Sequence, residues 1–275
     1  MNINCNGSLI DLALPKIMGI LNITPNSFFD GGKFDRLESA LAQTEKMLSE
    51  GATFIDVGGA SSKPGVKEIS LEEELSRVLP IIEQIVLTFP DAILSIDTYR
   101  SEVATKAVAA GAQIVNDISA GNMDSKMLQT VGRLGVPYIA MHMQGTPQTM
   151  QNHPNYEDVL STVRYFFAEK IMAAQDAGIQ DIILDPGFGF GKTGKHNFAM
   201  LHHLNTLHIE GVPLLVGVSR KSMIYKTLNT DAQGALNGTT VLNTVALQQG
   251  ANILRVHDVK EAKETIQLLA ALKEE

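Results

Sequence analysis

The chain has 275 residues, and its 22 Lys and Arg against 30 Asp and Glu give a formal net charge of −8. Hydrophobic residues make up 44% and charged residues 19%, a composition that supports a large core and excludes wholesale disorder. The acidic balance disfavours a broad nucleic-acid surface, although a local basic pocket could bind phosphate, and a single cysteine, Cys5, excludes an internal disulfide framework and a cysteine-rich zinc site.

The first residues carry no targeting signal. Residues 1–15 lack a basic start followed by a long apolar block, so no signal peptide is expected. No apolar run along the chain approaches the roughly 18 residues of a transmembrane helix. We therefore expect a reduced, cytoplasmic protein. Within this stretch SLIDLAL (8–14) predicts a short strand or hairpin ahead of the main fold.

Eight short runs rich in Ile, Val and Leu then alternate with longer amphipathic segments. Continuous apolar runs are typical of parallel strands that are covered on both faces. The runs are KIMGILNI (16–23), TFIDVGG (53–59), AILSIDT (92–98), QIVNDIS (113–119), PYIAMHM (137–143), DIILDPG (181–187), PLLVGVS (213–219) and NILRVH (252–257).

Helix signals lie between the runs. Residues 37–50 have apolar positions at helical spacing and end at Gly51, a favourable residue just past a helix. Ser70 is a predicted N-cap with Glu73 as its capping-box partner, and the internal Pro80 is expected to kink or interrupt that helix. Ser101 is expected to cap the next helix, which Gly111 closes.

Eight strand-and-helix units in about 260 residues predict an α/β fold, a (β/α)8 TIM barrel. An open doubly wound sheet is the alternative, but it usually has fewer strands, and no GxGxxG turn follows the first run. No linker-like segment divides the chain, so we expect residues 1–275 to form a single domain. The N-terminal strand or hairpin would then lie at the barrel bottom.

Each predicted strand ends in a hydrogen-bonding or ionisable side chain. Catalytic groups of this fold lie at the carboxyl ends of the strands, so these residues predict a polar pocket there. Capping of the barrel loops by the aspartates is the alternative interpretation. The residues are Asn22, Asp56, Asp97, Asn116, Asp117, His142, Asp185, Ser219, Arg220, Lys221, Arg255 and His257.

The pocket has two chemical halves. Asp97, Asn116 and Asp185 offer acceptors that suit the paired N–H donors of an amino-heterocycle. Lys221, Arg255 and His257 offer donors that suit phosphate or diphosphate. The sequence therefore predicts an acceptor floor for a heterocycle and a cationic rim for an anion.

Several separated motifs, in order from about Lys16 to Glu261, resemble those of the dihydropteroate synthase family. They are GILNITPNSFFDGG, DVGGASSKPG, SIDT, NDISAG, MHMQGTP, DPGFGFGKT, GVSRKS and NGTTVLNTVALQQGANILRVHDV. The resemblance implies condensation of 6-hydroxymethyl-7,8-dihydropterin diphosphate with p-aminobenzoate, giving dihydropteroate and pyrophosphate. It also implies Mg²⁺ as cofactor, a dissociative mechanism and a homodimer packed through helices near the end of the chain.

The resemblance assigns roles to residues position by position. Pterin contacts would come from Asp97, Asn116, Ile118, Met143, Asp185, Gly217 and Lys221, with Asp97 and Lys221 as catalytic residues. Diphosphate contacts would come from Asn22, Ser62, Lys63, Arg255 and His257, and Asn22 would also help to hold the Mg²⁺. Contacts to p-aminobenzoate would come from Ser62, Pro64, Phe190, Lys221 and Ser222. The glycines of DPGFGFGK would give a mobile loop that presents Phe188 and Phe190, with a purely structural role of both rings as the alternative.

Two loops depart from the family pattern. TPNSFFDGG stands where TPDSFSDGG is usual, which changes Asn26 and Phe29, and GGASSKPG stands where GGESTRPG is usual. Ala60 loses a carboxylate and Lys63 loses the guanidinium fork that binds an anion through two hydrogen bonds. We therefore expect ordinary pterin binding but altered affinity for p-aminobenzoate or sulfonamides.

Two further functions remain open at this point. One is another pterin-binding barrel enzyme, such as a methyltetrahydrofolate–corrinoid methyltransferase, which needs neither SRKS nor the RVH anion contacts. The other is a non-catalytic paralogue that binds the pterin without turnover. Fold alone does not separate these functions, so the residues of the site must do so.

Overall fold

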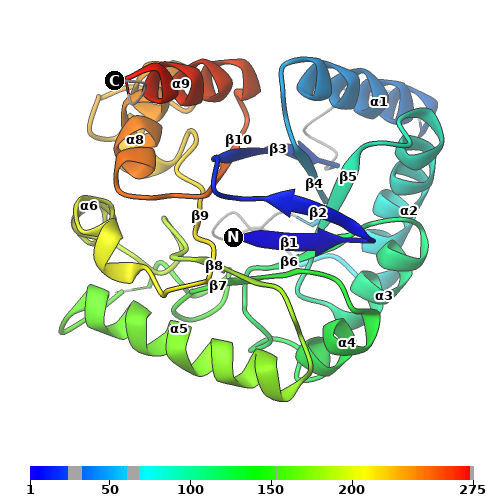
Figure 1. The fold of residues 1–275 in the computed structure, drawn as a ribbon, viewed down its shortest axis with the longest axis horizontal. Coiled ribbons are helices and arrows are strands. Elements are labelled where there is room, and N and C mark those ends of the chain that lie inside the picture. The colour runs from blue at the N-terminus through cyan, green and yellow to red at the C-terminus, as the bar shows by residue number, and fades with distance from the viewer. Residues whose placement is uncertain (24–32, 61–67, 153, 273–275) are drawn as a thin grey trace.

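A computed structural model describes residues 1–23, 33–60, 68–152 and 154–272 as a closed parallel barrel (Figure 1). Eight parallel strands form one sheet in the order β8-β7-β6-β5-β4-β3-β10-β9. A parallel bridge between Leu184 and Leu214 joins the two ends of this order and closes the sheet. The predicted (β/α)8 barrel is confirmed, and the open doubly wound sheet is excluded.

All eight predicted strands form, each within its apolar run. Their observed ends differ from the runs mainly because the last residues of each run already leave the sheet. The strands are β3 (Lys16–Asn22), β4 (Phe54–Gly58), β5 (Ile93–Asp97), β6 (Ile114–Asp117), β7 (Tyr138–Met141), β8 (Ile182–Asp185), β9 (Leu215–Val216) and β10 (Ile253–Val256).

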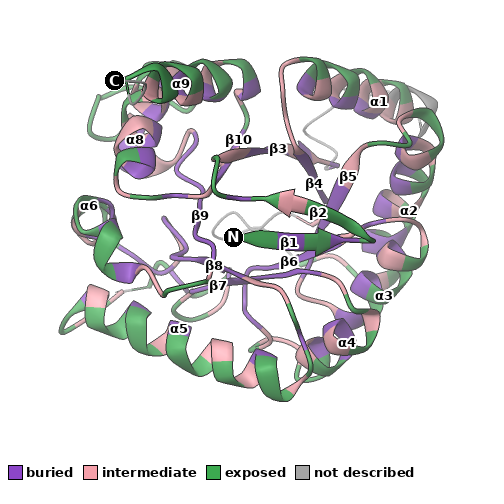
Figure 2. Cartoon of the chain, in the orientation of Figure 1, coloured by how far each residue is buried: buried purple, intermediate pink, exposed green. Residues whose placement is uncertain are grey.

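Helices surround the barrel, and their inner faces are buried while their outer faces are exposed (Figure 2). None of the helices in the described part of the chain has the length and apolarity to cross a membrane. The helices are α1 (Lys33–Ser49), α2 (Leu71–Thr88), α3 (Ser101–Ala109), α4 (Met127–Leu134), α5 (Val159–Asp176), α6 (Gly194–His202), α7 (Ser222–Tyr225), α8 (Leu236–Gln248) and α9 (Val259–Ala271).

The N-termini of α2 and α3 match the predicted helix signals only in part. Ser70 is its N-cap, with the Ser70 Oγ accepting from the Glu73 amide at 3.1 Å. The Glu73 carboxylate does not complete a capping box, because it pairs with Arg77 instead. The predicted interruption at Pro80 is wrong: α2 runs through it, and buried side chains on its inner face outweigh the missing backbone hydrogen bond. Ser101 is likewise the first residue of α3 rather than its N-cap.

The predicted N-terminal hairpin covers the barrel bottom, the end at which the strands begin. Strands β1 (Asn2–Cys5) and β2 (Ser8–Asp11) pair in antiparallel fashion across this end (Figure 1). Ile3 and Cys5 of the hairpin, together with Leu12, pack on a layer of inward-facing strand residues. This layer consists of Met18, Phe54, Ile114, Ile139, Ile183, Leu215 and Ile253. Because this end is filled with apolar side chains, a ligand must enter from the opposite end, where the strands finish.

Candidate active site

Above the apolar bottom layer the barrel interior becomes polar. Alternate residues of a strand face the same side, so the residues two positions beyond the bottom layer also face inward. On four strands those positions hold Asp56, Asn116, Asp185 and Arg255, and on β5 Ser95 stands two residues after Ile93, which is partly buried against the same layer. The corresponding residues of the other three strands are Ile20, Met141 and Gly217. Asp56 and Ser95 are fully buried, and Asn116 and Asp185 nearly so. The parallel register therefore places a ring of polar side chains halfway up the barrel.

Arg255 is the centre of this ring. Its Nε donates to Asp56 Oδ2 at 2.7 Å, and its Nη2 donates to Asp97 Oδ2 at 2.7 Å. The Asn116 amide donates to the same Asp56 oxygen at 2.9 Å. Side chains from β4, β5, β6 and β10 are thus joined in one network. Nε and Nη2 make these bonds, and Nη1 has no hydrogen bond to any described residue, so the predicted anion contact would use that nitrogen.

Two buried polar atoms of the ring have no hydrogen-bond partner among the described residues. They are Asp56 Oδ1 and Ser95 Oγ. A buried polar atom without a partner costs about 1–3 kcal/mol, so such atoms need a ligand or ordered water. The interior is therefore built to receive hydrogen-bond donors from something that the chain itself does not supply.

Burial and crowding shift the protonation of these groups. Burial raises the pKa of the Asp97 carboxyl to about 7, with the Arg255 charge opposing and the Asp56 charge reinforcing the rise. Burial also raises the pKa of Asp185, against the opposing charge of Lys221. For Arg255 burial acts to lower the pKa, but the charges of Asp56 and Asp97 outweigh it and keep the guanidinium charged.

Lys221 points into the site. It precedes α7, and its Nζ donates to the Phe188 carbonyl and lies 4.8 Å from the centre of the Phe190 ring. Burial lowers the pKa of Lys221 to about 8, and the Asp185 charge limits that fall. The structure thus brings together three residues of the prediction, Asp185, Lys221 and Phe190, and Ser222 follows as the first residue of α7.

Two glycines, Gly58 at the end of β4 and Gly217 just after β9, lie close to further predicted residues. A Cβ on Gly58 would lie 3.6 Å from Asn22 Oδ1 and 3.6 Å from Asp97 Oδ2, so these two side chains flank one point. A Cβ on Gly217 would lie 3.9 Å from Lys221 Nζ. At both positions a Cβ would be in ordinary van der Waals contact with charged or polar residues.

The remaining predicted residues have less direct roles in this geometry. His257 is exposed, and its Nδ1 lies 3.1 Å from Ser219 Oγ at the barrel mouth. Ile118 and Met143 follow β6 and β7 in phase with the inward residues Asn116 and Met141. Ser62, Lys63 and Pro64, together with the altered Asn26 and Phe29, lie outside the described residues.

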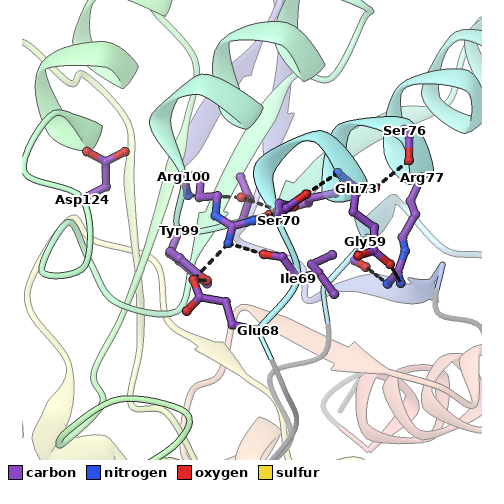
Figure 3. A network of polar contacts seen from close by, with 12 residues as sticks. Gly59, Glu68, Ile69, Ser70, Glu73, Ser76, Arg77, Tyr99, Arg100 and Asp124 are labelled. Atoms are coloured by element: carbon purple, nitrogen blue, oxygen red, sulfur yellow. Dashed lines mark hydrogen bonds and ion pairs between the residues drawn. The ribbon is translucent and has the colours of Figure 1, made fainter.

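A second network lies beside the site, where β5 ends (Figure 3). The Arg100 guanidinium donates to Glu74 Oε2 at 2.6 Å, to Glu68 Oε1 at 2.9 Å and to the Ile69 carbonyl at 2.6 Å. Thr98, the residue after Asp97, donates to Glu74 Oε1 at 2.7 Å. Residues 68–70 are thereby fixed to the end of the strand that carries Asp97.

Sequence reasoning missed two buried groups. The sequence pattern marks Asp56 only as a strand-end residue, whereas in the structure it accepts hydrogen bonds from both Asn116 and Arg255. Lys192 belongs to the motif DPGFGFGKT, which does not predict that it is 3% exposed and donates to three carbonyls. Asp56 could have been found from strand phase, because it stands two residues after the inward-facing Phe54.

Comparison with known proteins agrees with this geometry. The family described as pterin binding enzyme matches residues 18–257. Dihydropteroate synthase from Escherichia coli K12 is 44% identical over 273 residues, covering 98% of this chain and 96% of the relative. The Haemophilus influenzae dihydropteroate synthase is 42% identical, with 98% of each chain covered.

Solved structures show the same fold. Yersinia pestis dihydropteroate synthase in a sulfonamide drug complex has a TM-score of 0.94 at 43% identity, with 100% of both chains covered. The Xanthomonas albilineans enzyme in complex with 7,8-dihydropteroate has a TM-score of 0.90 at 37% identity, again with 100% of both chains covered. With identity at this level along nearly its whole length, the chain belongs to the dihydropteroate synthase family of pterin-binding enzymes.

Proposed function

We propose that this chain joins 6-hydroxymethyl-7,8-dihydropterin diphosphate to p-aminobenzoate, which forms 7,8-dihydropteroate and pyrophosphate in folate synthesis. The observation that carries the proposal is the buried hydrogen-bond network of Asp56, Asn116, Asp97 and Arg255, in which Asp56 Oδ1 has no partner among the described residues. Full-length relatives are dihydropteroate synthases, and one related structure holds the 7,8-dihydropteroate product.

Pterin recognition would use the acceptor half of the ring. The amino and ring N–H donors of a pterin match the carboxylates of Asp185 and Asp56 and the amide of Asn116. Ile118, Met143 and Gly217 would line the pterin ring. A pterin in this place would give Asp56 Oδ1 the partner that it lacks among the described residues.

The chemistry would begin with cleavage of the bond between the pterin methylene carbon and the diphosphate oxygen. The electron pair leaves with the diphosphate, where the Lys221 ammonium, Arg255 Nη1 and His257 would meet the developing negative charge. The methylene cation that remains is conjugated with the dihydropterin, and the Asp97 carboxylate would stabilise it. The p-aminobenzoate nitrogen then bonds to this carbon and loses a proton.

The second substrate would bind between Phe190, Lys221 and Ser222, with Ser62 and Pro64 completing the site. A related Xanthomonas albilineans structure contains 4-aminobenzoic acid, at a TM-score of 0.93 and 39% identity, with 100% of this chain and 98% of that chain covered. Lys221 reaches both halves of the site, since its Nζ lies over the Phe190 ring and near Gly217.

Mg²⁺ is the proposed cofactor, and the donor set fits a particular kind of site. The described residues contain no group of three or more His, Cys, Asp or Glu side chains placed to hold a metal. Mg²⁺ commonly binds through one or two protein oxygens plus substrate phosphates and water. Asn22 Oδ1 would be such a protein ligand, and the ion would neutralise charge on the diphosphate.

A homodimer is proposed through the helices near the end of the chain, α8 and α9, which contain most of VLNTVALQQG and IQLLAALK. These two helices contact each other, and their exposed side chains include Val241 and Leu268, which are 52% and 69% exposed. Apolar side chains gathered on adjacent helices are typical of an interface between subunits. The cytoplasmic location expected from the sequence likewise stays a prediction.

Omission assays test the proposed reaction. Purified protein is given pterin diphosphate, Mg²⁺ and p-aminobenzoate, each omitted in turn, and pyrophosphate and dihydropteroate are measured. We expect dihydropteroate to form only with all three present. Pterin binding by calorimetry without product would instead support a non-catalytic paralogue. The methyltransferase alternative is weaker, because this site also holds Lys221 and Arg255 where an anion would lie.

A further inference from the structure

The loop between β8 and α6 is more constrained than its glycine content predicts. Gly187, Gly189 and Gly191 have φ of +67°, +84° and +62°. A Cβ on Gly187 would lie 1.9 Å from the His142 carbonyl oxygen, and one on Gly191 would lie 2.6 Å from the Gln144 carbonyl oxygen. These glycines therefore permit close backbone packing, which their content alone, taken as a sign of a mobile loop, does not predict.

Every carbonyl from residue 187 to residue 193 accepts a hydrogen bond from a side chain. The donors come from five different residues in four parts of the chain, so the loop conformation is determined by its surroundings. The acceptor and donor pairs are Gly187 and Phe190 with Lys192 Nζ, Phe188 with Lys221 Nζ, Gly189 with Gln151 Nε2, Gly191 with Tyr156 Oη, and Lys192 and Thr193 with Asn197 Nδ2.

Lys192 is the unusual donor in this set. Its Nζ lies 2.9 Å from the Gly187 oxygen, 2.9 Å from the Phe190 oxygen and 3.2 Å from the His142 oxygen. It is 3% exposed, and no carboxylate oxygen of the described residues lies within 4.0 Å of it. A buried charge without a direct ion pair is costly, so the three carbonyl partners solvate it, and the charge of Asp185 farther away favours it as well.

Those carbonyls connect Lys192 to the active site. The Gly187 and Phe190 oxygens that it binds stand on either side of Phe188 and Gly189 in the chain. The Phe188 carbonyl accepts from Lys221, and the Phe190 ring lies under the same Lys221 ammonium. The Phe188 side chain is fully buried in the core, so the backbone of Phe188, rather than its ring, faces the site.

We propose that Lys192 is a positioning residue that holds the Phe188 carbonyl and the Phe190 ring where they orient Lys221 for the pterin diphosphate. The idea rests on the proposed function, in which Lys221 contacts the substrates. The ammonium with its three N–H donors occupies the centre of the loop, and neither a neutral nor a shorter side chain can replace all three bonds.

A double-mutant cycle tests this coupling. Lys192→Met, Lys221→Met and the double variant are compared with the wild type by kcat/KM for pterin diphosphate and by calorimetric Kd for the same ligand. Lys195→Met is the matched control, because Lys195 is exposed three residues away on α6. Lys192→Gln, which keeps two N–H donors, provides a second variant should Lys192→Met fold poorly, and thermal unfolding establishes which variants are folded.

We expect Lys192→Met to lower kcat/KM roughly tenfold or more in the wild-type background. In the Lys221→Met background the same substitution should lower kcat/KM by less than about threefold. Lys195→Met should change neither value. Equal losses in the two backgrounds would show a general structural role and overturn the proposal, as would no loss in a folded Lys192 variant. Wild-type protein without activity or pterin binding would instead overturn the proposed function.

Discussion

At the scale of single residues, Asp56 shows what local sequence patterns cannot reveal. Its importance comes from Arg255, which is 199 residues away in the chain and reaches it only because the barrel closes. The type of residue at each strand end could be predicted, but which carboxylate shares the guanidinium could not. Arg255 was expected to serve an anion alone, and the structure shows that two aspartates already orient it.

Asp56→Asn tests the importance of this shared carboxylate. The change keeps size and an acceptor oxygen but removes the charge opposite Arg255, so we expect kcat/KM for pterin diphosphate to fall roughly 10- to 100-fold, as for loss of a hydrogen bond to a charged group. Asp91→Asn makes the same substitution at an exposed position and should have no effect. Unchanged kinetics in folded Asp56→Asn protein would show that Arg255 is held well enough by Asp97 alone.

At the scale of elements, the strands were predictable because burial on both faces forces a continuous apolar run, which the sequence displays directly. Helix details were less predictable. Pro80 lies inside α2 because packing of residues such as Val78 and Ile82 overrides a local signal. The packing of the loop from residue 187 to residue 193 was unpredictable for the opposite reason: glycine suggests mobility, whereas here it allows close packing that distant donors then secure.

Substitution of two glycines with positive φ, Gly187 and Gly211, distinguishes the cost of backbone strain from the cost of lost close packing. Gly187→Ala would place a methyl group against the His142 carbonyl, whereas Gly211, with φ of +80°, has nothing within 4 Å of its would-be Cβ. Both substitutions share the backbone cost, about 1–2 kcal/mol. We therefore expect Gly187→Ala to lower the free energy of unfolding clearly more than Gly211→Ala in urea denaturation. Equal losses would mean that the loop can move away.

The Arg100 network predicts a large effect from a single ion pair. Arg100→Met would leave Glu74, which is 1% exposed, without its charged partner. Breaking a buried pair costs about 3–5 kcal/mol, whereas an exposed pair contributes less than about 1 kcal/mol. Lys106→Met, which breaks the exposed pair with Glu102, is the matched control. Similar urea midpoints for the two variants would contradict a stabilising role of the buried pair.

At the scale of the whole molecule, the sealed bottom and polar upper half of the barrel explain why its buried ionisable groups collect near the strand ends. The buried groups make the free energy of unfolding depend on pH, and Asp97 and His142 do so in opposite directions. Burial raises the pKa of Asp97 to about 7, above its unfolded value, so protonation of Asp97 favours the folded state as the pH falls through 7. Burial lowers the pKa of His142 to about 3, with the Lys192 charge adding to the fall, so protonation of His142 favours the unfolded state.

The sign of the His142 effect can be measured. An unfolded histidine has a pKa of about 6.5. The contribution of the neutral His142 ring to the free energy of unfolding is therefore complete above pH 6.5 and is lost as the pH falls toward 3. The slope from one such group is at most about 1.4 kcal/mol per pH unit. His142→Asn should therefore be less stable than the wild type at pH 7, because the packing of the ring on Phe166 is lost, and the gap should narrow by pH 5.

Urea denaturation of the wild type and of His142→Asn at pH 7, 6 and 5 gives the difference between their free energies of unfolding. Asp97 and the other titrating groups contribute equally to both proteins, so their effect cancels in this difference. His202→Asn is the matched control, because it makes the same substitution at an exposed position at the end of α6. A His142→Asn gap that stays constant from pH 7 to pH 5 would mean that the buried ring takes up its proton without unfolding. The charged imidazolium of His142 would then have a hydrogen-bond partner that the neutral ring does not have. In the structure, Nδ1 of His142 has no hydrogen-bond partner among the described residues.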